Sequence, residues 1–131
     1  MTDARDLSGV WYGSYAAQSR AVIGNAFIAH LTETAGGVGG AITERDIWRG
    51  SGIVRADVAG VRNGASVRFA KTYDGSGGMT HTVLYQGAVN DAGTEVAGSW
   101  TLGSYGGSFV MTREIFTDLA IEDTEELEVS A

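Results

Sequence analysis

The fold is decided by one alternating stretch, Ser66-Val67-Arg68-Phe69-Ala70-Lys71-Thr72-Tyr73. Successive side chains of a β-strand point to opposite faces, so Val67, Phe69, Lys71 and Tyr73 share one face. A second alternating run, residues 80–89, follows after a glycine-rich connection. The two runs therefore indicate neighbouring antiparallel strands whose larger, more aromatic faces are turned inward.

Eight alternating runs of this kind occur along the chain. They lie near residues 8–16, 25–33, 38–46, 53–60, 65–73, 80–89, 94–102 and 107–114. Their short connections leave no room for crossover helices and favour strands that pair in chain order. A flat eight-stranded sheet would expose two edges, whereas a closed sheet exposes none. The sequence therefore predicts an all-β protein, an eight-stranded antiparallel up-and-down meander barrel.

Length and composition fit a single domain of this kind. The 131 residues suffice for one hydrophobic core, which we assign to residues 1–114, followed by an acidic C-terminal tail over 115–131. The chain has no cysteine, which excludes disulfides and thiolate metal sites. The first residues contain no apolar leader and no apolar run approaches a membrane span, so we expect a cytoplasmic protein without membrane contact.

The net charge of −7 belongs to the tail. Residues 1–113 contain nine acidic and nine basic residues, whereas residues 114–131 contain seven acidic residues and no base. The neutral body therefore lacks the basic stripe that a nucleic-acid-binding protein needs, and no nucleic-acid partner is expected. The tail is interpreted as a solvated segment; whether it docks on the barrel or covers its mouth is left open.

One end of the barrel is expected to be closed and the other open. Alternate connections of a meander share an end, and those near 35–37, 61–64 and 90–93 are tight. At the other end, three connections are longer and the fourth is short; this end carries Trp48 and Tyr105. Binding residues tend to lie on such loops above a rigid scaffold, so we place the mouth of the barrel there.

The inward face supplies the candidate ligand-binding residues. Ligand sites are usually apolar cups with few polar contacts, which predicts a small, largely apolar ligand with one polar or anionic group. Aromatic walls are expected from Trp11, Phe69, Tyr85, Trp100 and Phe109. The polar end of the ligand is expected to meet Glu44, Lys71, Tyr73 and His81, and Tyr15 and Trp48 complete the predicted set.

Several short motifs resemble the avidin and streptavidin group of barrels, and more loosely the wider lipocalin-like barrels. They are Gly9-Val10-Trp11-Tyr12, Gly40-Ala41-Ile42-Thr43-Glu44, Val67 with Phe69, Tyr85-Gln86-Gly87 and Gly98-Ser99-Trp100. Their order and spacing match over roughly residues 8–110. The resemblance implies an eight-stranded meander with a ligand pocket at one end, and it implies a homodimer or higher homo-oligomer.

The residues that bind biotin in that group do not carry over. Where the group has an Asn, a Tyr and a small hydroxyl on its first and third strands, this chain has Gly13, Ile42 and Glu44. Where it has Ser and Thr on the sixth strand, this chain has His81 and Val83, and the last strand lacks the Asp that meets the ureido ring. A ureido group would leave buried polar atoms unpaired here, so biotin is not the expected ligand.

Three ionisable residues, Glu44, Lys71 and His81, are candidates for catalysis, and Arg55 could join them. A carboxylate, an ammonium and an imidazole in an apolar cup perturb one another's pKa and can move protons, and a desolvated lysine can form an imine. A structural ion pair and a hydrogen-bonded histidine explain the same residues equally well. The two histidines, His30 and His81, lack metal-ligand spacing, so neither a metal nor another cofactor is expected.

Three functions follow from these observations. The leading hypothesis is a binding barrel for a small molecule; whether the barrel also converts that molecule is left open. The second is a small isomerase or cyclase in which the barrel positions its substrate and Glu44 or His81 transfers a proton. The third is an oligomeric interaction module whose interior is filled by side chains.

Overall fold

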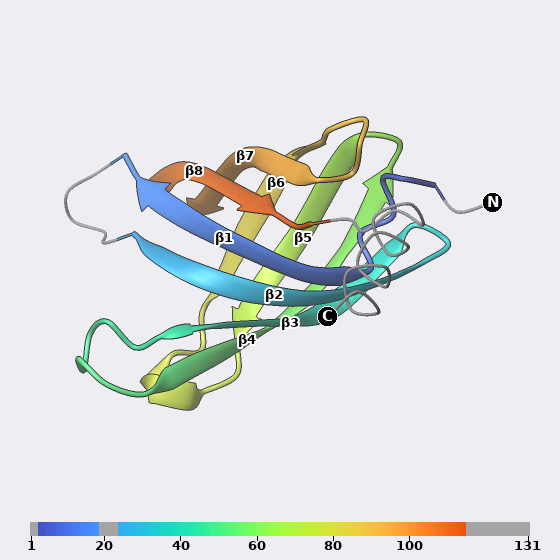
Figure 1. Cartoon of the computed structure of the whole chain (residues 1–131). Coiled ribbons are helices and arrows are strands. Elements are labelled where there is room, and N and C mark those ends of the chain that lie inside the picture. The colour runs from blue at the N-terminus through green and yellow to red at the C-terminus, as the bar shows by residue number, and fades with distance from the viewer. Residues whose placement is uncertain (1–2, 19–23, 115–131) are drawn as a thin grey trace, which may run out of the picture.

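The computed structural model describes residues 3–18 and 24–114 and confirms the all-β meander barrel (Figure 1). Its strands are β1 (Gly9–Ala17), β2 (Asn25–Thr34), β3 (Gly37–Arg45), β4 (Ile53–Asn63), β5 (Ser66–Tyr73), β6 (Thr82–Val89), β7 (Glu95–Leu102) and β8 (Tyr105–Thr112). Each strand pairs antiparallel with the next, and β1 also pairs with β8, so the sheet closes on itself. The predicted acidic tail, residues 115–131, lies outside the described residues.

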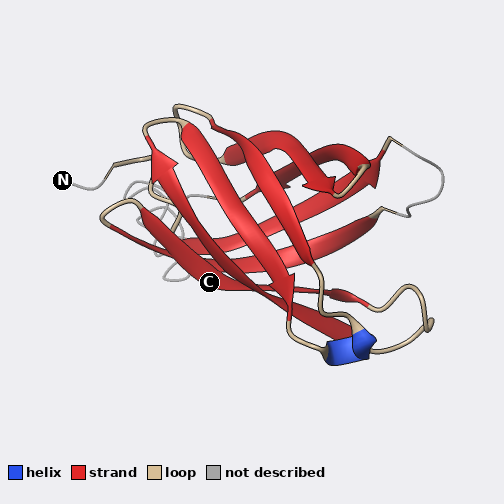
Figure 2. Ribbon diagram, turned by 180° about the vertical axis from the view of Figure 1, so that it is seen from behind, coloured by secondary structure: helices blue, strands red, loops and turns tan. Residues whose placement is uncertain are grey.

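The strands coincide with the alternating runs of the sequence except for small shifts at their ends. In the described part of the chain, the helical structure is confined to one 3₁₀ turn, η1 (Ser76–Gly78), between β5 and β6 (Figure 2). No helix among these residues has the length and apolar character that crossing a membrane requires. The meander is therefore built from strand pairing alone.

The two ends of the barrel differ as the connection lengths predict. The β2–β3 hairpin turns through Ala35 and Gly36, whose φ angles of 50° and 83° suit a two-residue hairpin. The β4–β5 hairpin is equally short, since Asn63 pairs with Ser66. The longer β3–β4 and β5–β6 connections lie together at the opposite end (Figure 2). Residues 19–23 of the β1–β2 connection are outside the described residues.

Alternate residues of every strand point inward and form the core. Phe69 pairs with Tyr85, and Tyr85 pairs with Trp100, so three aromatic residues lie side by side on β5, β6 and β7. The rings of Phe69 and Tyr85 are stacked with centroids 4.8 Å apart, and Phe109 packs edge-on against Tyr85 at 4.9 Å. On β1, Gly13 leaves room for the ring of Phe27, because a Cβ at that position would collide with it. Small and large inward residues thus interdigitate in the barrel interior.

The closed end is sealed by the segment that precedes β1. Leu7 is fully buried there, and Trp11 Nε1 donates to the Leu7 carbonyl at 2.9 Å. The guanidinium of Arg113 lies 4.3 Å from the Trp11 ring centroid and donates to the carbonyl of Ser8 at 2.7 Å. It also donates to the carbonyls of Asp6 and Gly93. Residues from both ends of the barrel sequence are therefore tied together at this end.

A buried ion pair fixes the same end. Arg62 donates through Nε to Glu33 Oε1 at 2.6 Å and through Nη2 to Glu33 Oε2 at 2.9 Å. The side chains of Glu33 and Arg62 are only 4% and 8% exposed. The Leu7 N–H donates to the same Glu33 carboxylate, and Arg62 also meets Asp3 at 3.1 Å. This two-pronged carboxylate–guanidinium geometry anchors the amino-terminal segment over the barrel.

Candidate functional site

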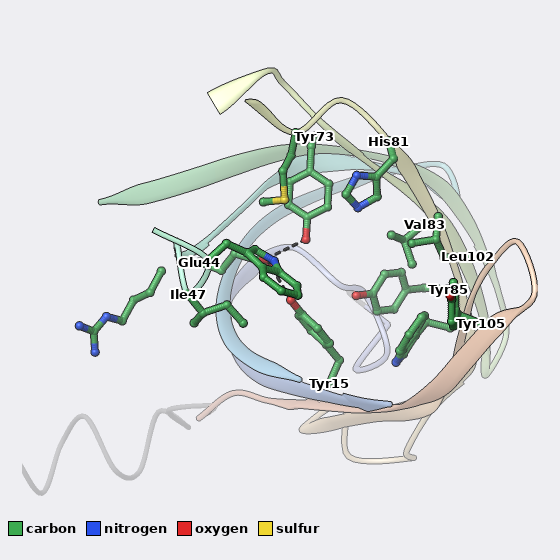
Figure 3. A pocket seen from close by; sticks show the side chains of 13 residues that line it. Tyr15, Glu44, Ile47, Tyr73, His81, Val83, Tyr85, Leu102 and Tyr105 are labelled. Carbon is green, nitrogen blue, oxygen red and sulfur yellow. Dashed lines mark hydrogen bonds between the residues drawn. The ribbon is translucent and has the colours of Figure 1, made fainter. Parts of the chain in front are cut away.

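A cavity of about 240 Å³ opens at the mouth, the end where the longer connections lie (Figure 3). It is lined by Tyr15, Glu44, Arg45, Ile47, Trp48, Tyr73, Met79, His81, Val83, Tyr85, Trp100, Leu102 and Tyr105. These residues come from six strands and from two of the mouth loops. The cavity is thus formed jointly by the rigid sheet and the loops above it.

Aromatic rings make up most of the wall. Tyr15 packs edge-on against Trp100 with ring centroids 6.2 Å apart, and Trp100 is held in place because its Nε1 donates to the Ala16 carbonyl at 3.0 Å. Tyr85 stands on its stack with Phe69, and its hydroxyl points into the cavity (Figure 3). A planar apolar ligand can therefore stack on rings that the barrel has already fixed.

Glu44 forms the polar floor of the cavity. Its Oε1 accepts hydrogen bonds from the hydroxyl of Tyr73 at 2.7 Å and from the hydroxyl of Tyr15 at 3.0 Å. Its Oε2 accepts from Lys71 Nζ at 2.7 Å. The carboxylate side chain is only 3% exposed, and three donors compensate its buried charge. Figure 3 shows the two tyrosine donors.

Lys71 lies behind Glu44 in an aromatic enclosure. Its Nζ is 4.8 Å from the ring centroid of Tyr15 and 4.9 Å from that of Tyr73, with Phe27 and Tyr85 at 5.7 Å. The rings and Glu44 both attract the ammonium. Burial lowers the pKa of Lys71 below its ordinary value of 10.5, and the Glu44 carboxylate opposes that shift. Lys71 does not line the cavity, so the structure gives it no route to act as an imine-forming nucleophile.

Three tyrosines of the cavity, Tyr15, Tyr73 and Tyr85, are held in their protonated form. Burial raises the pKa of Tyr73 and of Tyr15 far above 10, and the neighbouring Glu44 charge raises both further. The pKa of Tyr85 is raised mainly by burial, with smaller effects from Tyr15 and Glu44. Their hydroxyl protons consequently stay in place across the physiological pH range.

His81 stands at the rim, just before β6. Its ring centroid lies 4.6 Å from that of Tyr73, and the imidazole is exposed to solvent on its other side. Burial lowers the pKa of His81, the Lys71 ammonium lowers it further, and Glu44 opposes them. The imidazole is therefore neutral at pH 7, with one nitrogen able to accept a proton and the other able to donate one.

The loop between β3 and β4 is shaped by Asp46. Its Oδ1 accepts hydrogen bonds from the backbone N–H groups of Trp48 and Arg49 at 3.1 and 3.0 Å. Its backbone exchanges hydrogen bonds with Gly50 and Gly52, which closes the loop. This geometry holds the 62% exposed side chain of Trp48 at the edge of the cavity.

The structure brings together most of the predicted site residues. Tyr15, Glu44, Trp48, Tyr73, His81, Tyr85 and Trp100 all line the cavity. Lys71, Phe69 and Phe109 are buried and support it: Lys71 contacts Glu44, and the two phenylalanines pack beneath Tyr85. These three residues therefore do not face a ligand in the mouth cavity.

Two predicted positions are corrected. Trp11 points inward as expected, but it packs at the closed end under Arg113, because alternation gives the face of a residue and not its height in the barrel. Arg55 lies on the outer face, because its neighbours Val54 and Ala56 are the buried residues of β4. Neither residue joins the cavity.

Six lining residues are missing from the predicted set. Val83 and Leu102 share the inward period of His81 and Trp100, which could have identified them. Ile47 and Met79 come from loops, and Arg45 ends a strand, so no periodic signal marked these three. Tyr105, placed on a mouth loop by the sequence, also reaches the cavity.

Comparison with known proteins does not assign the site. No protein-family model matches the sequence, and a search of curated proteins finds no significant match. Within residues 3–18 and 24–114, no group of three His, Asp or Glu residues is arranged to hold a metal ion. The chemistry of the site is therefore inferred from its own geometry.

Proposed function

We propose that this protein binds a small, largely apolar molecule in the cavity at the mouth of its barrel. The observation that carries the proposal is an aromatic cavity of about 240 Å³ above a polar floor whose charges are already compensated. Binding to a cavity lined by fixed rings is favourable when an apolar ligand replaces the water in it. The interaction-module hypothesis requires an interior filled by side chains, whereas the mouth contains a cavity.

The size of the cavity limits the ligand. Sites for drug-sized molecules usually enclose about 300 to 1,000 Å³, so this cavity suits a smaller molecule of one or two fused rings. The likeness to the avidin and streptavidin group enters the proposal only as a shared architecture with the ligand at one end. Because Glu44 and His81 stand where biotin binders have small hydroxyls, we predict that calorimetry will detect no biotin binding of micromolar affinity or better.

Native mass spectrometry of the purified protein, before and after denaturation, is the direct test. A released mass of low molecular weight identifies the ligand class. A fragment screen by ligand-observed NMR then covers the case in which the ligand is lost during purification. If both give nothing, the binding function is wrong.

A pair of neighbouring variants localises the binding. Val83 lines the cavity, whereas Leu84, the next residue, is 58% exposed on the outer face. Val83→Phe fills the cavity and should abolish binding of a fragment that the wild type binds, while Leu84→Phe should leave it unchanged. Circular dichroism and thermal melting confirm that both variants are folded. Equal binding by both would place the ligand elsewhere.

His81 supports a second candidate function, a small-molecule isomerase or cyclase. A neutral imidazole that lies against Tyr73 and borders the cavity can take a proton from one atom of a substrate and return it to another. The test is incubation of the identified ligand with the protein in D₂O. Incorporation of deuterium that His81→Gln removes would favour catalysis, and its absence would leave binding alone.

A further inference from the structure

Whether the groups of the cavity floor donate or accept hydrogen bonds restricts which ligand can bind there. An ionised carboxylate can only accept hydrogen bonds, so each of its three contacts consumes a donor. Tyr15 and Tyr73 each have one hydroxyl proton, and both protons are directed to Glu44 Oε1 (Figure 3). The floor therefore has no hydroxyl proton left for a ligand.

What the floor offers to the cavity are acceptors. Each phenolic oxygen keeps a lone pair after it has donated its proton, and the Glu44 carboxylate retains acceptor positions beside its bound donors. Tyr15, Glu44 and Tyr73 all line the cavity, so these acceptors belong to its wall. The Tyr85 hydroxyl can donate or accept and does not discriminate between ligands.

The buried ammonium of Lys71 does not turn the cavity floor into a hydrogen-bond donor for the ligand. The side chain of Lys71 is 1% exposed, lies behind Glu44 and is enclosed by aromatic rings. An anionic group entering from the mouth would meet the carboxylate and the tyrosine oxygens before it could reach the ammonium. Arg45, which does line the cavity, is exposed to solvent at the rim.

We infer that the ligand is a planar aromatic or conjugated molecule that presents an N–H or O–H donor, neutral or cationic, to Glu44, Tyr15 and Tyr73. This inference rests on the proposed binding function and narrows its ligand class. It narrows the polar or anionic group of the predicted ligand to a hydrogen-bond donor. A ligand that lacks the donor leaves these buried oxygens without the partners that water supplied, and such mismatches discriminate strongly.

Matched pairs of small ring compounds test the inference on the full-length protein. Indole and benzofuran have the same shape but differ in an N–H donor and an oxygen acceptor, and phenol and anisole differ similarly. Benzoate supplies an anion of comparable size. Ligand-observed NMR and calorimetry measure the affinities. Indole and phenol should bind at least about tenfold more tightly than benzofuran and anisole, and benzoate should not displace indole.

A double variant shows whether the floor is responsible. Lys71→Met with Glu44→Gln removes both charges together and gives the floor an amide N–H₂ donor. Its preference for indole over benzofuran should fall to less than about threefold. Arg55→Gln, on the outer face, is the matched control and should keep the full preference. Dispersed NMR spectra establish that both variants are folded.

The outcomes separate the two proposals. If no compound of the set or of the fragment screen binds, the binding function itself fails. If the acceptor compounds or benzoate bind as well as the donors, or if the double variant keeps its preference, the donor inference is wrong although the barrel still binds ligands.

Discussion

Each end of the barrel buries an ion pair of a carboxylate with a cation, but the two pairs have different roles. At the closed end, Arg62 grips Glu33 with two parallel hydrogen bonds, and the amino-terminal segment covers the pair. At the mouth, Lys71 reaches Glu44 with a single short hydrogen bond, and two tyrosine hydroxyls complete the carboxylate. The same charges hold chain segments at one end and line an open cavity at the other.

The difference shows what makes a buried ion pair functional. The partners at the closed end include backbone groups, such as the N–H of Leu7 and the carbonyl of Gly64. The partners at the mouth are side chains whose oxygens border about 240 Å³ of cavity. A polar group that borders a cavity is available to a ligand, whereas a polar group covered by the chain itself stabilises the fold.

Loss of the closed-end cation should have the largest effect on stability. Arg62→Met leaves Glu33 buried without its guanidinium, which typically destabilises a protein by about 3 to 5 kcal/mol. Urea unfolding followed by tryptophan fluorescence measures this loss. Fragment affinity at the mouth should stay within about twofold of the wild type under folding conditions. A large change in affinity would show that the two ends are coupled.

Loss of the cation at the mouth, Lys71, should lower the free energy of unfolding less than loss of Arg62 does. It should change ligand binding more. Lys71→Met is expected to destabilise by about 3 kcal/mol, because two tyrosine donors still compensate Glu44. The double variant with Glu44→Gln should recover more than half of that loss, since no uncompensated charge remains. Equal stabilities of the single and double variants, again by urea unfolding, would contradict the role of the ion pair.

Alkaline pH should lower the stability of the folded barrel through the tyrosines at its mouth. Tyr15, Tyr73 and Tyr85 have raised pKa values, so above pH 10 the unfolded chain releases protons that the folded chain keeps. The three tyrosines contribute their full share to the free energy of unfolding below pH 10. At pH 10.5 this share is smaller by up to about 2 to 3 kcal/mol, and the half-buried Tyr15 accounts for the smallest part of the loss. The lowered pKa of Lys71 acts in the opposite direction, but only up to its ordinary 10.5.

Absorbance at 295 nm measures this titration. Of the five tyrosines in the sequence, we expect three to ionise only together with unfolding, as seen by circular dichroism. Tyr73→Phe should reduce that late step by one tyrosine. Ionisation of all five before the fold is lost would show that the mouth is open to hydroxide.

The smallest effect on stability is expected at the loop. Trp48→Ala removes a ring that is 62% exposed, so stability should change by less than about 0.5 kcal/mol. Affinity for a fragment should fall several-fold, because the ring borders the cavity. Thermal melting and calorimetry together separate the two quantities. Unchanged affinity would place the ligand deeper, among Tyr15, Tyr85 and Trp100.

Strand positions and the inward face could be predicted because alternation is a local property. The faces of Phe69, Tyr73 and Tyr85 follow from their period of two, and connection lengths placed the mouth. Height in the barrel could not be predicted, because tilted strands bring residues of different sequence position to one level. For that reason Trp11 was grouped with Trp100 although the two lie towards opposite ends.

Contacts between distant side chains were beyond the sequence pattern. Alternation predicted that Glu44 and Lys71 share the interior, but it did not show that Tyr15 and Tyr73 would complete the same carboxylate. The segment around Leu7 has no period, so its packing against Glu33 and Arg113 carried no signal. Such partners are fixed by tertiary geometry.

The pairing of β1 with β8 has a consequence for how the molecule is made. Every other strand pair is a hairpin of neighbours, and such local contacts form quickly. The β1–β8 seam joins Tyr12 to Thr112, and Arg113 then reaches the carbonyls before β1. On the ribosome the barrel can close only after residue 113 has left the exit tunnel. Until then the nascent sheet has two free edges, which makes this the interval in which it is most exposed to aggregation.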